Sequence, residues 1–210
     1  MKKNILFVFA HYDDEAFSAG TIRKMVNEGH NVQVLIICGN GYVLDEPRKE
    51  MFKKNVGLMG CCGSTLKYFD LTLSDLKEEV KSEIKASVSQ LIIDDKIDYV
   101  YTNHSGDLHP DHKIVSDMIR TACRPGLTTI KGLYECYISG ATEYGLGIYN
   151  FNIIVDVTDT YPIKKQCFVN YDTHLKNGSS WEVTNNCSKY IGGLYNIQYT
   201  EMFKLIWEKQ

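Results

Sequence analysis

The sequence predicts an α/β fold of the Rossmann-like type, with a mostly parallel sheet, helices on both faces and an irregular C-terminal third. Apolar runs rich in β-branched and aromatic residues recur along the chain. They are nearly continuous rather than alternating, which is typical of strands buried on both faces. Segments with helical periodicity separate them, as in a parallel sheet with crossover helices. The 210 residues, 44% of them hydrophobic, predict a single domain over residues 1–210.

The expected strands follow the apolar runs. They comprise residues 4–10, 32–38, 66–71, 97–103 and 152–157, with 130–138 as a further candidate. The first run follows two lysines and so imitates a signal peptide. It is very short, however, and charged residues follow at once, so we interpret it as a strand. No run approaches the roughly 18 apolar residues that span a bilayer, so no membrane span is expected.

Periodicity and boundary residues predict the helices. Pro47 precedes one of them and Gly60 ends it, while Gly29 ends the first. The expected helices are residues 17–28, 48–59, 74–93, 112–123, 163–174 and 198–208. Residues 176–180 are expected to form a loop between the last two.

Composition excludes some functional classes. The net charge of −3 does not indicate a nucleic-acid-binding protein, which usually carries a basic patch. The seven cysteines are an odd number without Cys-x-x-Cys spacing, so we expect reduced thiols and a cytoplasmic location. Apolar edges in the irregular C-terminal third would suit a homo-oligomer.

Two clusters of acidic residues and histidines directly follow two of the apolar runs. The first is His11-Tyr12-Asp13-Asp14-Glu15 and the second is Asp107-Leu108-His109-Pro110-Asp111-His112. Because ligands of open parallel sheets bind beyond the carboxyl ends of the strands, we expect the clusters to share one site. Imidazole and carboxylate together suit zinc, which indicates a metal-dependent hydrolase.

Each cluster also has a simpler interpretation. Asp13, Asp14 and Glu15 are typical of an acidic helix start, and single histidines in a loop often only contact solvent. If the clusters do form a site, adjacent Asp13 and Asp14 can do different work, one binding the metal and the other accepting a proton. One histidine of the second cluster can bind metal while the other acts as an acid or oxyanion stabiliser.

The two clusters resemble a known family. Residues 10–15 resemble the Ala-His-Pro-Asp-Asp-Glu signature of the PIG-L/LmbE-like de-N-acetylases, with Tyr12 in place of proline. Residues 109–112 resemble their His-x-Asp-His motif. Weaker resemblances, which extend to about residue 174, are Arg48 and Glu50, Tyr134-Glu135, Asp156-Val157-Thr158, Lys165 and Tyr171.

The resemblance implies a Rossmann-like zinc enzyme that removes acetyl from an N-acetylglucosamine-type substrate, a small-molecule sugar conjugate. It implies one Zn²⁺ per chain, or another divalent metal in its place. Carried over by motif, the metal ligands are His11, Asp14 and His112. Asp13 is then the general base, His109 stabilises the oxyanion or protonates the leaving amine, and Asp111 orients a histidine.

Substrate contacts and substrate identity leave more alternatives open. Arg48, Asn40, Tyr134 and Glu135 are candidates to line the pocket. The substrate could instead carry another N-acyl group, as in an antibiotic or a thiol precursor. A non-catalytic Rossmann-like binding module is a further alternative. A nucleotide-binding protein is disfavoured because no Gly-x-Gly-x-x-Gly follows the first strand.

Overall fold

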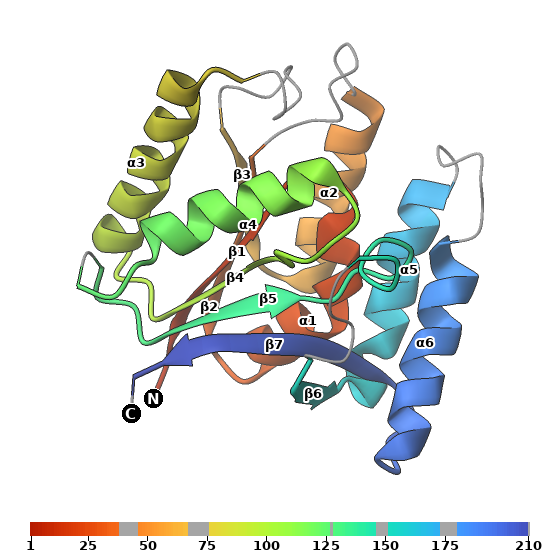
Figure 1. Ribbon diagram of the computed structural model, residues 1–210. Helices are drawn as coiled ribbons and strands as arrows, with labels where there is room; N and C mark the ends of the chain where they lie inside the picture. Colours follow the sequence, from red (N-terminus) through yellow and green to blue (C-terminus); the bar gives the residue numbers. More distant parts are fainter. Residues whose placement is uncertain (38–45, 67–75, 127, 146–150, 173–179, 210) are drawn as a thin grey trace.

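A seven-stranded sheet organises the computed structural model, with helices on both of its faces (Figure 1). The structure describes residues 1–37, 46–66, 76–126, 128–145, 151–172 and 180–209. The strand order is β3-β2-β1-β4-β5-β7-β6. The predicted α/β class is confirmed.

The strands are parallel except for one. They are β1 (Asn4–Phe9), β2 (Asn31–Ile36), β3 (Cys62–Thr65), β4 (Tyr99–Asn103), β5 (Gly132–Cys136), β6 (Ile153–Asp156) and β7 (Thr200–Glu208). β1 pairs in parallel with both β2 and β4, whereas β7 pairs antiparallel with β5 and β6. β1 therefore lies inside the sheet, and the loop that follows it emerges between the ends of its two neighbours.

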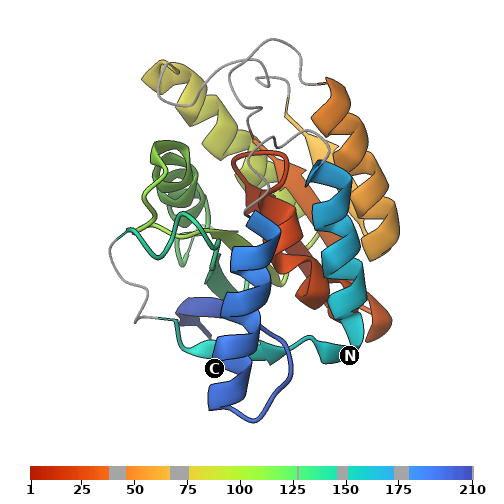
Figure 2. The same cartoon turned by 90° about the vertical axis from the view of Figure 1, so that its right-hand side faces the viewer.

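The helices lie in two layers. They are η1 (Asp14–Ser18), α1 (Ala19–Asn27), α2 (Glu46–Met59), α3 (Glu78–Asp94), α4 (Pro110–Ala122), η4 (Thr158–Thr160), α5 (Tyr161–Asp172) and α6 (Ser180–Leu194). Figure 2 shows α3 and α4 on one side of the sheet, and α1, α2 and α5 on the other. No helix in the described part of the chain has the length and apolar character to cross a membrane.

Strand β1 supplies both layers of the core, because its successive side chains point to opposite faces. Leu6 and Val8 pack in the cluster beneath α3 and α4, whereas Phe7 and Phe9 pack in the cluster beneath α1, α2 and α5. All four side chains are inaccessible to solvent. The near-continuous apolar run of β1 thus reflects burial on two faces, as predicted.

The prediction of a C-terminal helix over residues 198–208 is wrong. Residues 200–208 form β7, which pairs with β5 on one side and with β6 on the other. Met202, Phe203, Ile206 and Trp207 have helical spacing, which explains the error. Pairing with two strands overrides that local pattern. Helix α6 was not predicted, although its first residue, Ser180, lies in the expected loop.

Other predicted boundaries need smaller corrections. The third strand was expected at residues 66–71 but lies at Cys62–Thr65, and residues 67–71 are outside the described part. All four β3 residues are exposed, because β3 is an edge strand, and so its sequence carries no apolar run. The expected helix over 74–93 begins at Glu78, and residues 17 and 18 belong to η1 rather than α1.

Candidate metal centre

The carboxyl ends of β1 and β4 bring the two clusters together. The strands are in parallel register, with Val8 opposite Thr102, so the residues that follow each strand emerge at one edge of the sheet. Oδ1 of Asn103, at the end of β4, accepts a hydrogen bond from the Ala10 amide at 2.9 Å. This bond fixes the loop that carries the first cluster.

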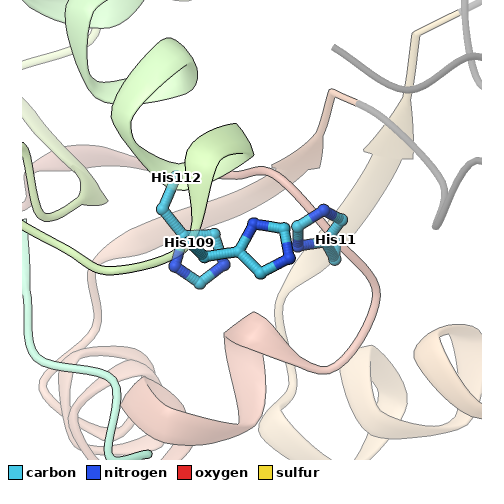
Figure 3. Close-up of side chains that lie close together, drawn as sticks. All are labelled: His11, His109 and His112. Atoms are coloured by element: carbon cyan, nitrogen blue, oxygen red, sulfur yellow. The ribbon is translucent and has the colours of Figure 1, made fainter. Parts of the chain in front are cut away.

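Three imidazoles converge at this edge (Figure 3). His11 comes from the loop after β1, and His109 and His112 come from the start of α4. One nitrogen of each lies within 4.8 Å of one nitrogen of each of the others. His11 and His112 are buried, whereas His109 is exposed. Nitrogen donors at such separations suit a transition metal such as zinc.

A buried carboxylate, Asp14, completes this cluster. Its Oδ1 lies 3.3 Å from Nε2 of His112, and its Oδ2 lies 3.8 Å from Nδ1 of His11. The side chain of Asn103 and the backbone amide of His11 each donate to Oδ2 at 3.1 Å. Burial acts to raise the pKa of Asp14, but the adjacent imidazoles outweigh it and hold that pKa below its usual range. The carboxylate is therefore ionised and can bind a cation.

The outer nitrogen of His112 is held by Asp107. Nδ1 of His112 lies 2.9 Å from Oδ2 of Asp107, which leaves Nε2 directed at Asp14. Burial lowers the pKa of His112, but the charges of Asp14 and Asp107 more than compensate and raise it to about 10. This pocket therefore favours positive charge, as a cation site requires.

Asp111, which was predicted to orient a histidine, contacts the first cluster. Its Oδ2 lies 3.0 Å from Nε2 of His11, so the aspartate of the second motif holds the histidine of the first. The backbone amide of Asp111 donates to Nδ1 of His109 at 3.2 Å, which makes His109 the N-terminal cap of α4. Each of these imidazoles thus has one nitrogen engaged by Asp111.

Asp13 has an unusual backbone and an unusual carboxyl group. Its φ of 99° lies in the left-handed region, which non-glycine residues rarely adopt. Burial and the charge of Asp14 raise the pKa of Asp13 to about 7, although Arg48, His11 and His112 oppose the rise. A carboxyl group with a pKa near neutrality is suited to accept and release a proton.

The candidate substrate contacts are more dispersed. Arg48 is partly buried near the start of α2, and its charge acts on Asp13. Tyr134 stacks on Tyr101 within the core, at 4.7 Å between ring centroids. Glu135 is fully buried and its carboxylate contacts His104, Ser105, Ser116 and Arg120. Asn40 lies outside the described residues.

Three supporting residues were not assigned roles from the sequence. Asn103 binds both Ala10 and Asp14, Asp107 binds His112, and Glu15 binds the amide of Asp13. Asp107 and Glu15 do stand within the two clusters, so their positions were a usable signal. The amide of Asn103, at the end of an apolar strand, had no such signal.

The family assignment depends on a segment that contains both clusters. A family model described as PIG-L: GlcNAc-PI de-N-acetylase matches residues 6–123, from β1 through α4. The chain belongs to the PIG-L family. The expected resemblance is confirmed, and with it an amide-hydrolysing, de-N-acetylase type of enzyme. A comparison with curated proteins finds no match.

Solved structures share the fold of this PIG-L family member along nearly its whole length. The N,N'-diacetylchitobiose deacetylase from Pyrococcus horikoshii aligns with a TM-score of 0.74 and 19% identity, covering 97% of this chain and 84% of that one. A zinc-inhibited form of teicoplanin deacetylase aligns at 0.76 and 12%, covering 99% of each. The 4-carboxy-2-hydroxymuconate hydratase from Pseudomonas putida KT2440 aligns at 0.76 and 12%, covering 99% and 98%. At these identities the likeness shows the fold alone.

Proposed function

We propose that the protein is a metal-dependent hydrolase that removes an acetyl group from an N-acetylglucosamine-type sugar conjugate. Membership of the PIG-L family supports de-N-acetylation. The observation that carries the proposal is the buried contact of Asp14 with His112, at 3.3 Å, beside His11. In this proposal residues 1–210 form one deacetylase domain that works in the cytoplasm.

The proposed metal ligands are His11, Asp14 and His112. His109 is the competing third ligand, because its nitrogen also lies within 4.8 Å of the other two imidazoles. We favour Asp14 because it is buried and ionised, and because an anionic ligand offsets part of the charge of a divalent cation. We propose one Zn²⁺ per chain, with another divalent metal as the alternative. The alternative is supported by the solved structure of a teicoplanin deacetylase in a zinc-inhibited form, since zinc inhibits that protein.

A divalent metal held by these residues would polarise the acetyl carbonyl and lower the pKa of a bound water to about 7. Asp13 takes the proton from the attacking water, for which its pKa of about 7 is suited. Water oxygen bonds to the carbonyl carbon, the C–N bond breaks, and acetate and an amine leave. Asp13 then passes this proton to the amine nitrogen, because a neutral His109 could give up its Nε2 hydrogen only by becoming an imidazolate.

His109 is proposed to stabilise the oxyanion. Because its Nδ1 accepts the Asp111 amide, its neutral ring carries the hydrogen on Nε2 and can donate there. Burial and the neighbouring His11 and His112 lower the pKa of His109, which favours that neutral form. Its exposed side chain is accessible to an entering substrate. In this proposal the side chain of Asp111 orients His11, and the backbone amide of Asp111 holds the ring of His109.

The substrate side of the proposal is less detailed. Arg48 is the candidate for a hydroxyl, phosphate or carboxylate contact, because its charge already acts on Asp13. Tyr134 and Glu135 are buried, so we propose that they support the pocket wall, and Asn40 stays a candidate outside the described residues.

Amine release from a panel of N-acetylglucosaminides tests the function. Wild-type protein with one metal equivalent should release acetate and amine, while Asp13→Ala should keep the metal and lose about 10²–10⁴-fold in kcat. Asp117→Ala is the control, because Asp117 is exposed on α4. Full activity in Asp13→Ala would remove the base assignment. Turnover only of other N-acyl substrates would support the antibiotic or thiol-precursor alternative, and metal binding without turnover would support a binding module.

A further inference from the structure

The backbone of Asp13 is strained at the position where the candidate base is attached. A non-glycine residue at φ 99° and ψ −28° needs surrounding contacts to hold it there. Glycine would adopt this conformation freely, but it carries no carboxyl group. The chain therefore needs another group that favours this backbone conformation.

Glu15 makes the contact that meets this need. Its Oε2 accepts the backbone amide hydrogen of Asp13 at 3.0 Å. Its Oε1 accepts hydrogen bonds from the Tyr171 hydroxyl at 2.6 Å and from Nδ2 of Asn55 at 3.1 Å. Glu15 and Asn55 are inaccessible to solvent, and Tyr171 is 1% exposed. The acid thus joins the catalytic loop to α5 and α2, and it is not a solvated residue of a helix start.

The frame around Glu15 is itself fixed. Asn55 donates to the carbonyl oxygen of Cys167 at 3.3 Å, and its Oδ1 accepts from Nδ2 of Asn170 at 2.7 Å. Both partners lie on α5, which packs against α2 and η1. Movement of Glu15 would therefore break several buried hydrogen bonds, so its second oxygen is presented to Asp13 at a fixed place.

We propose that Glu15 is a positioning residue, which aims the carboxyl group of Asp13 at the metal centre by holding the Asp13 amide. The inference rests on the proposed function, in which Asp13 is the base. A purely structural role for Glu15, in which it only joins α2 to α5, is the competing interpretation. That interpretation predicts a loss of stability with kcat retained.

Glu15→Gln separates the two roles. The amide has the shape of the carboxylate but only one accepting atom. If its oxygen keeps Asn55 and Tyr171, its NH₂ faces the Asp13 N–H, and two donors cannot bond. Glu201→Gln is the matched control. Glu201 is also a buried acid that accepts backbone amides, those of Gly20 and Thr21, but it lies outside the proposed catalytic group.

Glu15→Gln should lower kcat about 100-fold, the loss that a ~1 Å misplacement can cause, with KM and metal stoichiometry nearly unchanged. Glu201→Gln should lose stability but keep kcat within about threefold. If Glu15→Gln does not fold, Glu15→Asp serves, because its shorter side chain cannot span from the Asp13 amide to Asn55 and Tyr171. Equal retention of kcat in the Glu15 and Glu201 variants would overturn the proposal.

A crystal structure of the Glu15 variant gives a readout that needs no turnover. The φ angle of Asp13 should leave the left-handed region. If the wild type releases no amine from any substrate while this angle moves, the proposed function fails and the structural part of the inference stands. If Asp13 keeps its conformation in the variant, the inference fails whatever the activity.

Discussion

Asp107 forms a buried pair with His112 of the histidine cluster, with 2.9 Å between Oδ2 of Asp107 and Nδ1 of His112. The same carboxylate oxygen accepts a hydrogen bond from Oγ1 of Thr142 at 3.3 Å, and Oδ1 accepts from the His109 amide at 3.2 Å. Asp107 thus fixes the orientation of one histidine and the backbone of another. A carboxylate behind a metal-binding imidazole also sets which nitrogen faces the metal.

Asp107→Ala should weaken zinc binding by about 10–100-fold, because Nδ1 of His112 loses the partner that orients its ring. Competition with a chelator of known affinity measures this change. Asp117→Ala, on the exposed side of α4, is the control and should bind zinc like the wild type. Unchanged affinity in Asp107→Ala would show that the pair plays no part in metal binding.

The strained backbone of Asp13 should lower the free energy of unfolding by a measurable amount. Asp13→Gly should be more stable than Asp13→Ala by about 1 kcal/mol, because glycine adopts a φ of 99° without steric cost. Urea unfolding of the metal-free proteins gives the difference. Gly57→Ala is the matched control with the opposite sign, since Gly57 lies in α2 and a Cβ added there would meet no described atom within 4 Å beyond its chain neighbours and the helix backbone. Alanine there should stabilise by about 0.5–1 kcal/mol.

The third metal ligand can be decided by metal content. His112→Ala and Asp14→Ala should lose the metal, whereas His109→Ala should keep it and lose about 10²–10³-fold in kcat, as expected when one oxyanion donor is removed. Elemental analysis after gel filtration measures the metal. Loss of metal from His109→Ala, with retention in Asp14→Ala, would instead favour the ligand set of three histidines.

A buried ion pair should stabilise the C-terminal third. Nζ of Lys164 on α5 lies 2.9 Å from Oε1 of Glu201 on β7, and both side chains are at most 4% exposed. Lys164→Met should cost about 3–5 kcal/mol in the free energy of unfolding, because Glu201 is left buried and unpaired. Lys53→Met, which breaks an exposed pair with Glu50, should leave the stability nearly unchanged. A small effect of Lys164→Met in urea unfolding would mean that Glu201 is satisfied by its backbone donors alone.

Much of the fold could be predicted from the sequence where burial leaves a periodic pattern. β1 and β4 are buried on both faces, so their apolar runs were recognisable, and Gly60 indicated the end of α2 correctly, whereas α4 begins two residues before the expected start at 112. β3 and β7 were misplaced for opposite reasons. The β3 residues are exposed and carry no apolar signal, while β7 has a helix-like spacing that its pairing with β5 and β6 overrides.

The candidate site was predictable only in part for a similar reason. The two clusters follow strands whose ends are adjacent in a parallel sheet, so their meeting could be expected from topology. The contacts of the supporting residue Glu15 could not be predicted, because they join distant segments. Asn55 reaches Glu15 across 40 positions and Tyr171 reaches it across 156. No local sequence pattern predicts such pairs. Likewise, the contact of Asp111 with His11 depends on how α4 packs.

The most direct measurement is acetate release from an N-acetylglucosaminide by metal-free protein during titration with zinc. We expect no turnover without metal and a rate that rises until about one equivalent per chain is bound, since the proposed ligands His11, Asp14 and His112 would form a single site. A rate that is the same before and after the addition of zinc, and that is insensitive to other divalent metals, would contradict a metal-dependent de-N-acetylase.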